Sequence, residues 1–233
     1  MTQNVSATPA LELIGVAKIY GRSVALRATN LRLERGEALA LLGPNGSGKT
    51  TLLKIVAGAL TPTAGRARIF GRDMFADRAE VRLDAGLLSS DTYLYDDLSA
   101  RENLRFVATM LGRPLNATGI DALLRRVRLE SQADARVRSF SSGMKRRLSL
   151  ARLLLLSPRL LLLDEPYNSL DAAGADLVDE VVREALAEGR SAMVATHDAE
   201  RALQLAGRVA VLDRGRMRYL GPVASYRREH RVV

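Results

Sequence analysis

Residues 38–57 read ALALLGPNGSGKTTLLKIVA, and this stretch decides the fold. Its first five residues, Ala38 to Leu42, form a short continuous apolar run that is typical of a strand buried on both faces. A glycine-rich turn follows, and a helical apolar pattern begins at Thr51. A buried strand, a turn and a helix in this order predict an α/β fold with a mainly parallel sheet.

The turn from Gly43 to Thr50 matches the pattern G-x-x-x-x-G-K-[ST] in full. Its glycines let backbone N–H groups surround phosphate oxygens, and the helix N-terminus adds positive potential. A glycine-rich turn with a merely exposed lysine is the plainer alternative, but the flanking strand and helix disfavour it. We therefore predict ATP and Mg²⁺ as cofactors, with Thr50 as a metal ligand. The predicted nucleotide contacts are Gly43, Asn45, Gly46, Ser47, Gly48, Lys49, Thr50 and Thr51.

A second apolar run, Leu160–Leu163, ends in two acids, Asp164 and Glu165. Because parallel strands end at the same edge of a sheet, we expect these acids beside the glycine-rich turn. Asp164 would hold Mg²⁺ directly or through water, and Glu165 would polarise the water that attacks the terminal phosphate. Two solvated acids that cap the next segment are the alternative, yet acids after four buried leucines need a compensating cation or ligand.

A third predicted strand, Ala192–Ala195, is followed by Thr196 and His197. A lone histidine is usually structural, but this one would reach the same sheet edge as the other two motifs. We therefore predict Glu165 and His197 as the catalytic residues.

The remaining pattern indicates one domain, residues 1–233, with an inserted helical part. Alternating apolar and polar residues predict strands at a sheet edge in an N-terminal antiparallel β portion. After residue 90 a capping box at Ser99 and Glu102 opens a helical stretch, in which Gly119 and Gly143 mark breaks. We expect a core of about 1–90 and 159–233 around a helical subdomain of about 91–158. The further predicted strands are Leu11–Val16, Leu26–Leu33 and Val209–Leu212, and the further predicted helices are Ala172–Ala187 and Ala199–Leu205.

The composition limits the function classes. The chain has no cysteine and two histidines, which excludes disulfides and thiolate or histidine-rich metal sites. The net charge is +9, but the arginines are scattered among acids, so we expect a solvated surface suited to an anionic membrane and no nucleic-acid partner. The chain lacks an apolar run long enough to span a membrane, and its polar N-terminus lacks an export signal. We therefore expect a cytoplasmic protein.

The order of the motifs resembles the ABC ATPase family over essentially the whole chain. Behind the glycine-rich turn come FSSGMK at 140–145, LLDEP at 162–166, SLD at 169–171 and then His197. The resemblance implies a head-to-tail dimer, expected to be a homodimer, in which the signature segment contacts ATP held by the opposite subunit. It also implies that Tyr20 stacks on adenine. The signature residues that it assigns to nucleotide binding are Ser141, Ser142 and Gly143.

Two positions depart from the family pattern. Ser142 and Met144 replace a glycine and a glutamine of the usual signature. The resulting Ser-x-Gly-Met-Lys pattern is similar to that of one exporter branch. Residues 88–92, LSSDT, lack the glutamine that the family uses to sense Mg²⁺, and the position falls on Ser90 or Asp91. Asp91 is therefore the expected substitute ligand for Mg²⁺, unless water fills the gap.

The pattern is similar to the ATP-binding subunits of haem exporters in cytochrome c biogenesis, the expectation taken first, and it is also similar to multidrug and polysaccharide exporters of the same branch. The resemblance implies an ATPase, peripheral on the inner face of the cell membrane, that drives export by a separate membrane permease. Soluble ABC ATPases acting on DNA or in translation are disfavoured because they carry long insertions or a second domain. A switch without turnover is disfavoured by the presence of Glu165 and His197.

Overall fold

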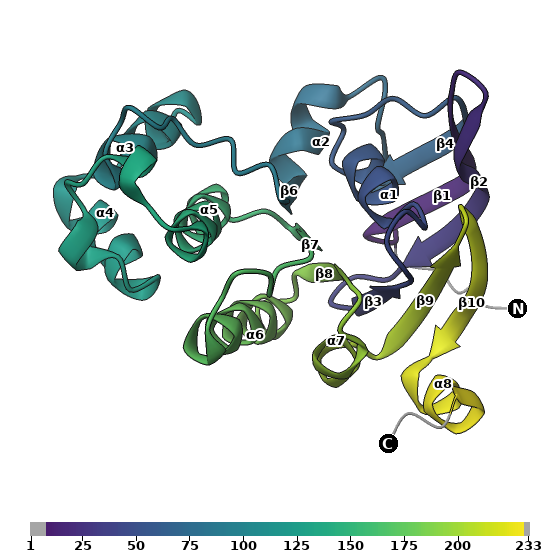
Figure 1. The fold of residues 1–233 in the computed structure, drawn as a ribbon. Coiled ribbons are helices and arrows are strands. Elements are labelled where there is room, and N and C mark those ends of the chain that lie inside the picture. Colours follow the sequence, from purple (N-terminus) through teal and green to yellow (C-terminus); the bar gives the residue numbers. More distant parts are fainter. Residues whose placement is uncertain (1–7, 231–233) are drawn as a thin grey trace, which may run out of the picture.

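The computed structural model describes residues 8–230, so the first seven residues of the polar N-terminus lie outside it. Its larger sheet has six strands in the order β10-β9-β3-β8-β7-β6 (Figure 1). Only β10 is antiparallel to its neighbour, and the other pairs are parallel. The strands are β3 (Ala38–Leu42), β6 (Ala85–Leu88), β7 (Leu160–Asp164), β8 (Ser191–Thr196), β9 (Arg208–Asp213) and β10 (Arg216–Pro222).

Strands β3, β8 and β7 are neighbours in this sheet, and every residue in them is buried. Helices cover both faces, which explains why these strands are continuous apolar runs rather than alternating ones. The predicted strand Ala38–Leu42 is confirmed with its bounds. The three motifs that follow these strands therefore meet at one edge of the sheet.

The smaller sheet has four antiparallel strands in the order β2-β1-β4-β5. The prediction that both N-terminal strands lie at a sheet edge is wrong for β1, which runs between β2 and β4. Alternation reports one buried face and says nothing about hydrogen-bonded neighbours: Leu11 and Leu13 are buried, whereas Ile14 is exposed. The strands are β1 (Leu11–Tyr20), β2 (Ser23–Leu33), β4 (Ala64–Ile69) and β5 (Arg72–Asp73).

Two apolar cores lie on opposite faces of the larger sheet. Leu39 and Leu41 of β3 join the core that contains helix α1 and the smaller sheet. Ala40 and Leu42, one residue out of phase, join the core that contains the helices after residue 99, whereas Val81 of α2 belongs to the first core. The helices outside the helical group are α1 (Lys49–Val56), α2 (Arg78–Asp84), α6 (Ala172–Ala187), α7 (Ala199–Leu205) and α8 (Val223–His230). The bounds predicted for α6 and α7 are confirmed.

Helices α3 (Ala100–Met110), α4 (Ala117–Arg126) and α5 (Ser142–Leu156) form a group to one side of the larger sheet (Figure 1). The capping box of α3 is confirmed. Gly119 and Gly143 do not break helices, because each lies in the first turn of a helix that a side chain caps just before it. Short 3₁₀ turns at Glu130–Gln132 and Val137–Ser139 connect α4 to α5.

Candidate functional site

The glycine-rich turn forms a hollow of about 180 Å³ at the start of α1. A Cβ on Gly43 would lie 2.1 Å from the Leu212 carbonyl oxygen, and a Cβ on Gly48 would lie 2.6 Å from that of Ala25, so both glycines are required sterically. Gly48 is the N-cap of α1, and no side chain caps this helix. The first N–H groups of α1 are thus available to an anion. The hollow is lined by Ala25, Asn45, Gly46, Ser47, Gly48, Lys49, Thr50, Thr51 and Glu165.

Lys49 and Asp164 place opposite charges at this hollow. The ammonium group of Lys49 donates to the Gly43 carbonyl at 2.6 Å and lies 3.6 Å from Glu165 Oε1. Asp164 is buried, which raises the pKa of its carboxyl group, while a hydrogen bond with Thr50 opposes that rise. One oxygen of Asp164 is buried without a hydrogen-bond partner.

These residues fit a magnesium ion shared with phosphates. Within residues 8–230, no cluster of three or more acidic, histidine or cysteine side chains could hold a metal alone. A cation here would need oxygen ligands from a nucleotide beside the unpartnered oxygen of Asp164 and the Thr50 hydroxyl. This combination is the usual one for Mg²⁺, which prefers few protein ligands together with phosphates and water.

The carboxylate of Glu165 is held from one side only. Its Oε2 accepts a hydrogen bond from Thr196 Oγ1 at 3.1 Å and lies 2.9 Å from His197 Nδ1. Its Oε1 is buried and has no hydrogen-bond partner. The structure therefore brings Glu165 and His197 together, with one carboxylate oxygen left to face the Lys49 side of the hollow.

The signature segment lines a different hollow. Ser141 caps α5 by accepting a hydrogen bond from the Met144 N–H at 3.2 Å, and Ser142 and Gly143 form the first turn. A Cβ on Gly143 would lie 2.7 Å from the Ser169 carbonyl oxygen, so this segment packs directly on residues 169–171. None of the residues that line this second hollow lines the first.

Two predicted site residues have partners of other kinds. Tyr20 ends β1 with half of its surface exposed, and the ammonium group of Lys18 lies 4.9 Å from its ring centroid. Asp91 pairs through Oδ2 with Lys54 of α1 at 2.9 Å. The metal role of Asp91 and the stacking role of Tyr20 stay predictions.

Sequence reasoning missed Arg146, which contacts the backbone of the site. Arg146 is 6% exposed, and its guanidinium donates to the carbonyl oxygens of Ser89, Asp164 and Glu165. Arg146 precedes Leu150 by four residues and Leu153 by seven. This spacing puts its side chain on the same face of the helix as these buried leucines. A basic residue in register with buried leucines is the signal that could have found it.

Comparisons with known proteins identify the family. A model of the family described as ABC transporter matches residues 26–168. The daunorubicin resistance ATP-binding protein DrrA3 of Streptomyces coeruleorubidus is 38% identical over 213 residues, 91% of this chain and 67% of the relative. The Nod factor export ATP-binding protein I of Cupriavidus pinatubonensis is 38% identical over 90% of this chain and 65% of the relative. The chain thus spans about two thirds of the length of these relatives.

A solved structure supports the same assignment. The dimeric post-hydrolysis state of the ATP-binding cassette MJ0796, bound to ADP and Pi, superposes with a TM-score of 0.82 at 26% identity. The match covers 91% of this chain and 98% of that one. No helix in residues 8–230 combines the length and apolar character needed to cross a membrane. The family model, the relatives and the solved structure together show that the chain belongs to the ABC transporter family, as one of its ATP-binding, ATP-hydrolysing subunits.

Proposed function

We propose that this chain couples ATP hydrolysis to the export of an organic molecule through a separate membrane permease. The observation that carries the catalytic part is the geometry of Glu165, whose carboxylate is anchored to His197 and Thr196 by one oxygen, while the other makes no hydrogen bond and faces Lys49 at 3.6 Å. A group held in this way can accept the proton of an attacking water molecule without having to reorganise.

Each residue of the site then has a defined task. The N–H groups at the start of α1 orient the phosphates, and Lys49 contacts the terminal ones. Bound Mg²⁺ would supply charge stabilisation for the leaving group and would be held by Thr50 and Asp164. Glu165 accepts the proton from water, and His197 fixes the Glu165 carboxylate and contacts the terminal phosphate. Tyr20 offers its exposed ring to adenine.

The separate hollow at the signature supports an ATP-dependent homodimer. Ser141, Ser142 and Gly143 share no hollow with the glycine-rich turn of their own chain. In a head-to-tail dimer they would complete the partner's site, because the N–H groups at the start of α5 suit a terminal phosphate. The related cassette MJ0796 was solved as a dimer in a post-hydrolysis state.

The names of the relatives support a class of exported molecule and no single compound. Their names refer to daunorubicin resistance and to Nod factor export. These names give haem export in cytochrome c biogenesis no support, although the sequence pattern had favoured it. We therefore propose an organic export substrate, of the drug or Nod factor kind that the relatives' names give, with this chain peripheral on the membrane.

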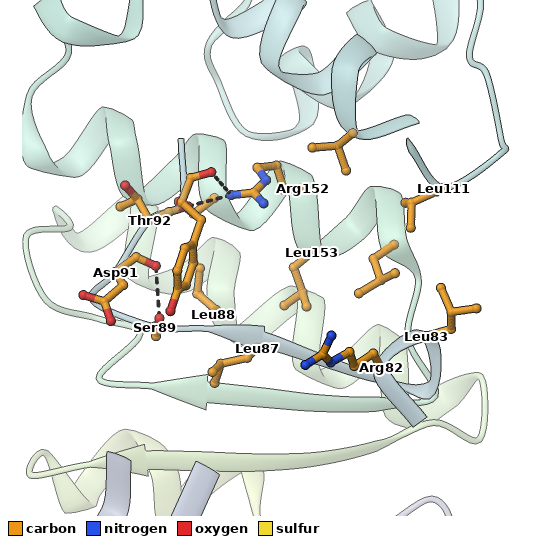
Figure 2. A pocket seen from close by; sticks show the side chains of 14 residues that line it. Arg82, Leu83, Leu87, Leu88, Ser89, Asp91, Thr92, Leu111, Arg152 and Leu153 are labelled. Atoms are coloured by element: carbon orange, nitrogen blue, oxygen red, sulfur yellow. Dashed lines mark hydrogen bonds between the residues drawn. The ribbon is translucent and has the colours of Figure 1, made fainter. Parts of the chain in front are cut away.

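A groove of about 320 Å³ between β6 and the helical group is the proposed contact with the permease (Figure 2). Leu87 and Leu153 line it, and Arg152 closes one side by donating to the carbonyls of Thr92 and Tyr93 at 2.6 and 2.7 Å. Exposed apolar side chains, which water does not favour, form part of its rim: Leu83 is 52% exposed and Tyr93 61% exposed. A short amphipathic segment of a membrane protein would cover them.

The variant Glu165→Gln tests the proposed catalytic role. An amide has the shape of the carboxylate but cannot accept the proton, so kcat for ATP hydrolysis should fall by about 100-fold or more while ATP still binds. With ATP the variant should sediment as a dimer, and without ATP as a monomer. Lys49→Ala is the contrasting control, because losing the ammonium group should weaken ATP binding itself.

Turnover of Glu165→Gln at the wild-type rate would remove Glu165 from this role. A protein that binds ATP but stays monomeric well above the nucleotide Kd would contradict the proposed dimer.

A further inference from the structure

Arg146 is a buried cation whose three acceptors are all backbone carbonyl oxygens. Its Nη1 donates to Ser89 at 2.6 Å, and its Nη2 donates to Asp164 at 3.0 Å and also to Glu165. A guanidinium keeps its charge in a protein, and burying a charge among neutral acceptors is unfavourable. Burial indeed lowers the pKa of Arg146, although the nearby charges of Asp164 and Glu165 favour its charged form.

The backbone of Glu165 needs to be held. Its φ is +47°, in the left-handed region that residues other than glycine seldom adopt. Its N–H donates to the Ala195 carbonyl at 2.7 Å, and its own carbonyl accepts from Arg146. The strained residue is thus fixed at both of its peptide groups, and its carboxylate is aimed at His197.

The same guanidinium joins three parts of the molecule. Arg146 belongs to α5, the helix that begins at the signature segment. Ser89 follows β6 and lines the groove proposed for the permease. Glu165 faces the glycine-rich turn. We call the loop that begins at Ser89, directly after β6, the groove loop. A displacement of α5 or of this groove loop therefore acts on the Glu165 peptide through the Arg146 side chain.

We infer that Arg146 is a positioning residue that holds the Glu165 peptide in its left-handed conformation and links the orientation of the carboxylate to α5 and to the groove. This inference rests on the proposed role of Glu165. It assigns Arg146 no contact with ATP and no proton to transfer.

The test compares Arg146→Gln and Arg146→Lys with wild type. Gln cannot reach three carbonyls, so kcat should fall about 10- to 100-fold, the loss that a misplacement of roughly 1 Å causes, while the ATP Kd stays within about twofold. Lys keeps the charge but has a single nitrogen, so the kcat of Arg146→Lys should lie between that of Arg146→Gln and that of wild type. Asn103→Ala is the matched control, because Asn103 is also buried and donates to the Tyr95 and Ser99 carbonyls.

A merely structural role would lower the melting temperature without this split between kcat and Kd, as Asn103→Ala is expected to do. Adding Arg146→Gln to Glu165→Gln should cause no further loss of turnover, since both act through one carboxylate. If Glu165→Gln is inactive while both Arg146 variants keep the wild-type kcat, this inference alone is overturned. If Glu165→Gln keeps wild-type turnover, the proposed function fails and this inference with it.

Discussion

Asp164 lies at the end of β7 with 3% of its surface exposed. Its negative charge suits the proposed binding of Mg²⁺, but burying that charge lowers the stability of the fold. Burial raises the pKa of this carboxyl group, so the folded protein binds the proton more tightly than the unfolded chain does. The resulting destabilisation is present at neutral pH, and it disappears as the pH falls below the ordinary value of 3.8. Residues of this kind are typical of functional sites, where activity is maintained at the expense of stability.

We therefore expect Asp164→Asn to raise the melting temperature at pH 7 by about 2 to 4 °C, the shift that about 1 kcal/mol gives at this size, and to abolish Mg²⁺-dependent hydrolysis. The gain should shrink as the pH falls through the raised pKa and vanish only below about 3.8. Thermal melts with and without Mg²⁺ and ATP measure both effects, and Asp97→Asn, at an 85% exposed side chain, is the control that should change neither. A lower melting temperature for Asp164→Asn at pH 7 would show that the buried charge stabilises the fold.

At the scale of single elements, the start of α3 depends on two reciprocal hydrogen bonds. The Ser99 hydroxyl accepts from the Glu102 N–H at 3.1 Å, and the Glu102 carboxylate accepts from the Ser99 N–H at 2.8 Å. The second bond lowers the pKa of Glu102 below its ordinary value of 4.5. The stabilisation from Glu102 is therefore complete above that value and is lost as the pH falls through the lowered pKa of the folded state.

Replacing Ser99 by Ala should lower the free energy of unfolding by about 1 kcal/mol, because the helix loses its cap. Glu102→Gln should lower the melting temperature at pH 7, and this difference from wild type should shrink once the pH is below about 4.5. Asp77→Ala is the matched control, since Asp77 stands at the N-cap of α2 without making a capping hydrogen bond. Equal losses at the two helices would argue against the capping box as the cause.

The whole molecule joins a nucleotide site at one edge of the larger sheet to a groove beside the helical group. Introducing a charge at the rim of that groove should weaken attachment to the permease without any change at the nucleotide site. Leu83→Asp should shift the protein from the membrane pellet to the supernatant when cells that express its permease are fractionated. Ile14→Asp is the control, because Ile14 is similarly exposed at 54% but lies on β1 of the other sheet. Leu83→Asp protein that pellets like wild type would exclude this face as the docking site.

The sequence by itself determined the elements whose signals are local. The glycine-rich turn, the capping box and the acids behind Leu160–Leu163 depend on backbone conformation and periodicity within a few residues, and they lie where they were predicted. The meeting of Glu165 with His197 also followed from the sequence, because parallel strands end at one edge of a sheet.

Only the tertiary structure decided which distant groups touch. Arg146 reaches Ser89 across 57 positions of the chain and Glu165 across 19, and Asp91 reaches Lys54 across 37. No local pattern specifies such pairs, because they depend on how α5 and the groove loop pack against the sheet. The neighbours of β1 in the smaller sheet are of the same kind, since a strand's alternation reports which of its faces is buried but not which strands form hydrogen bonds with it.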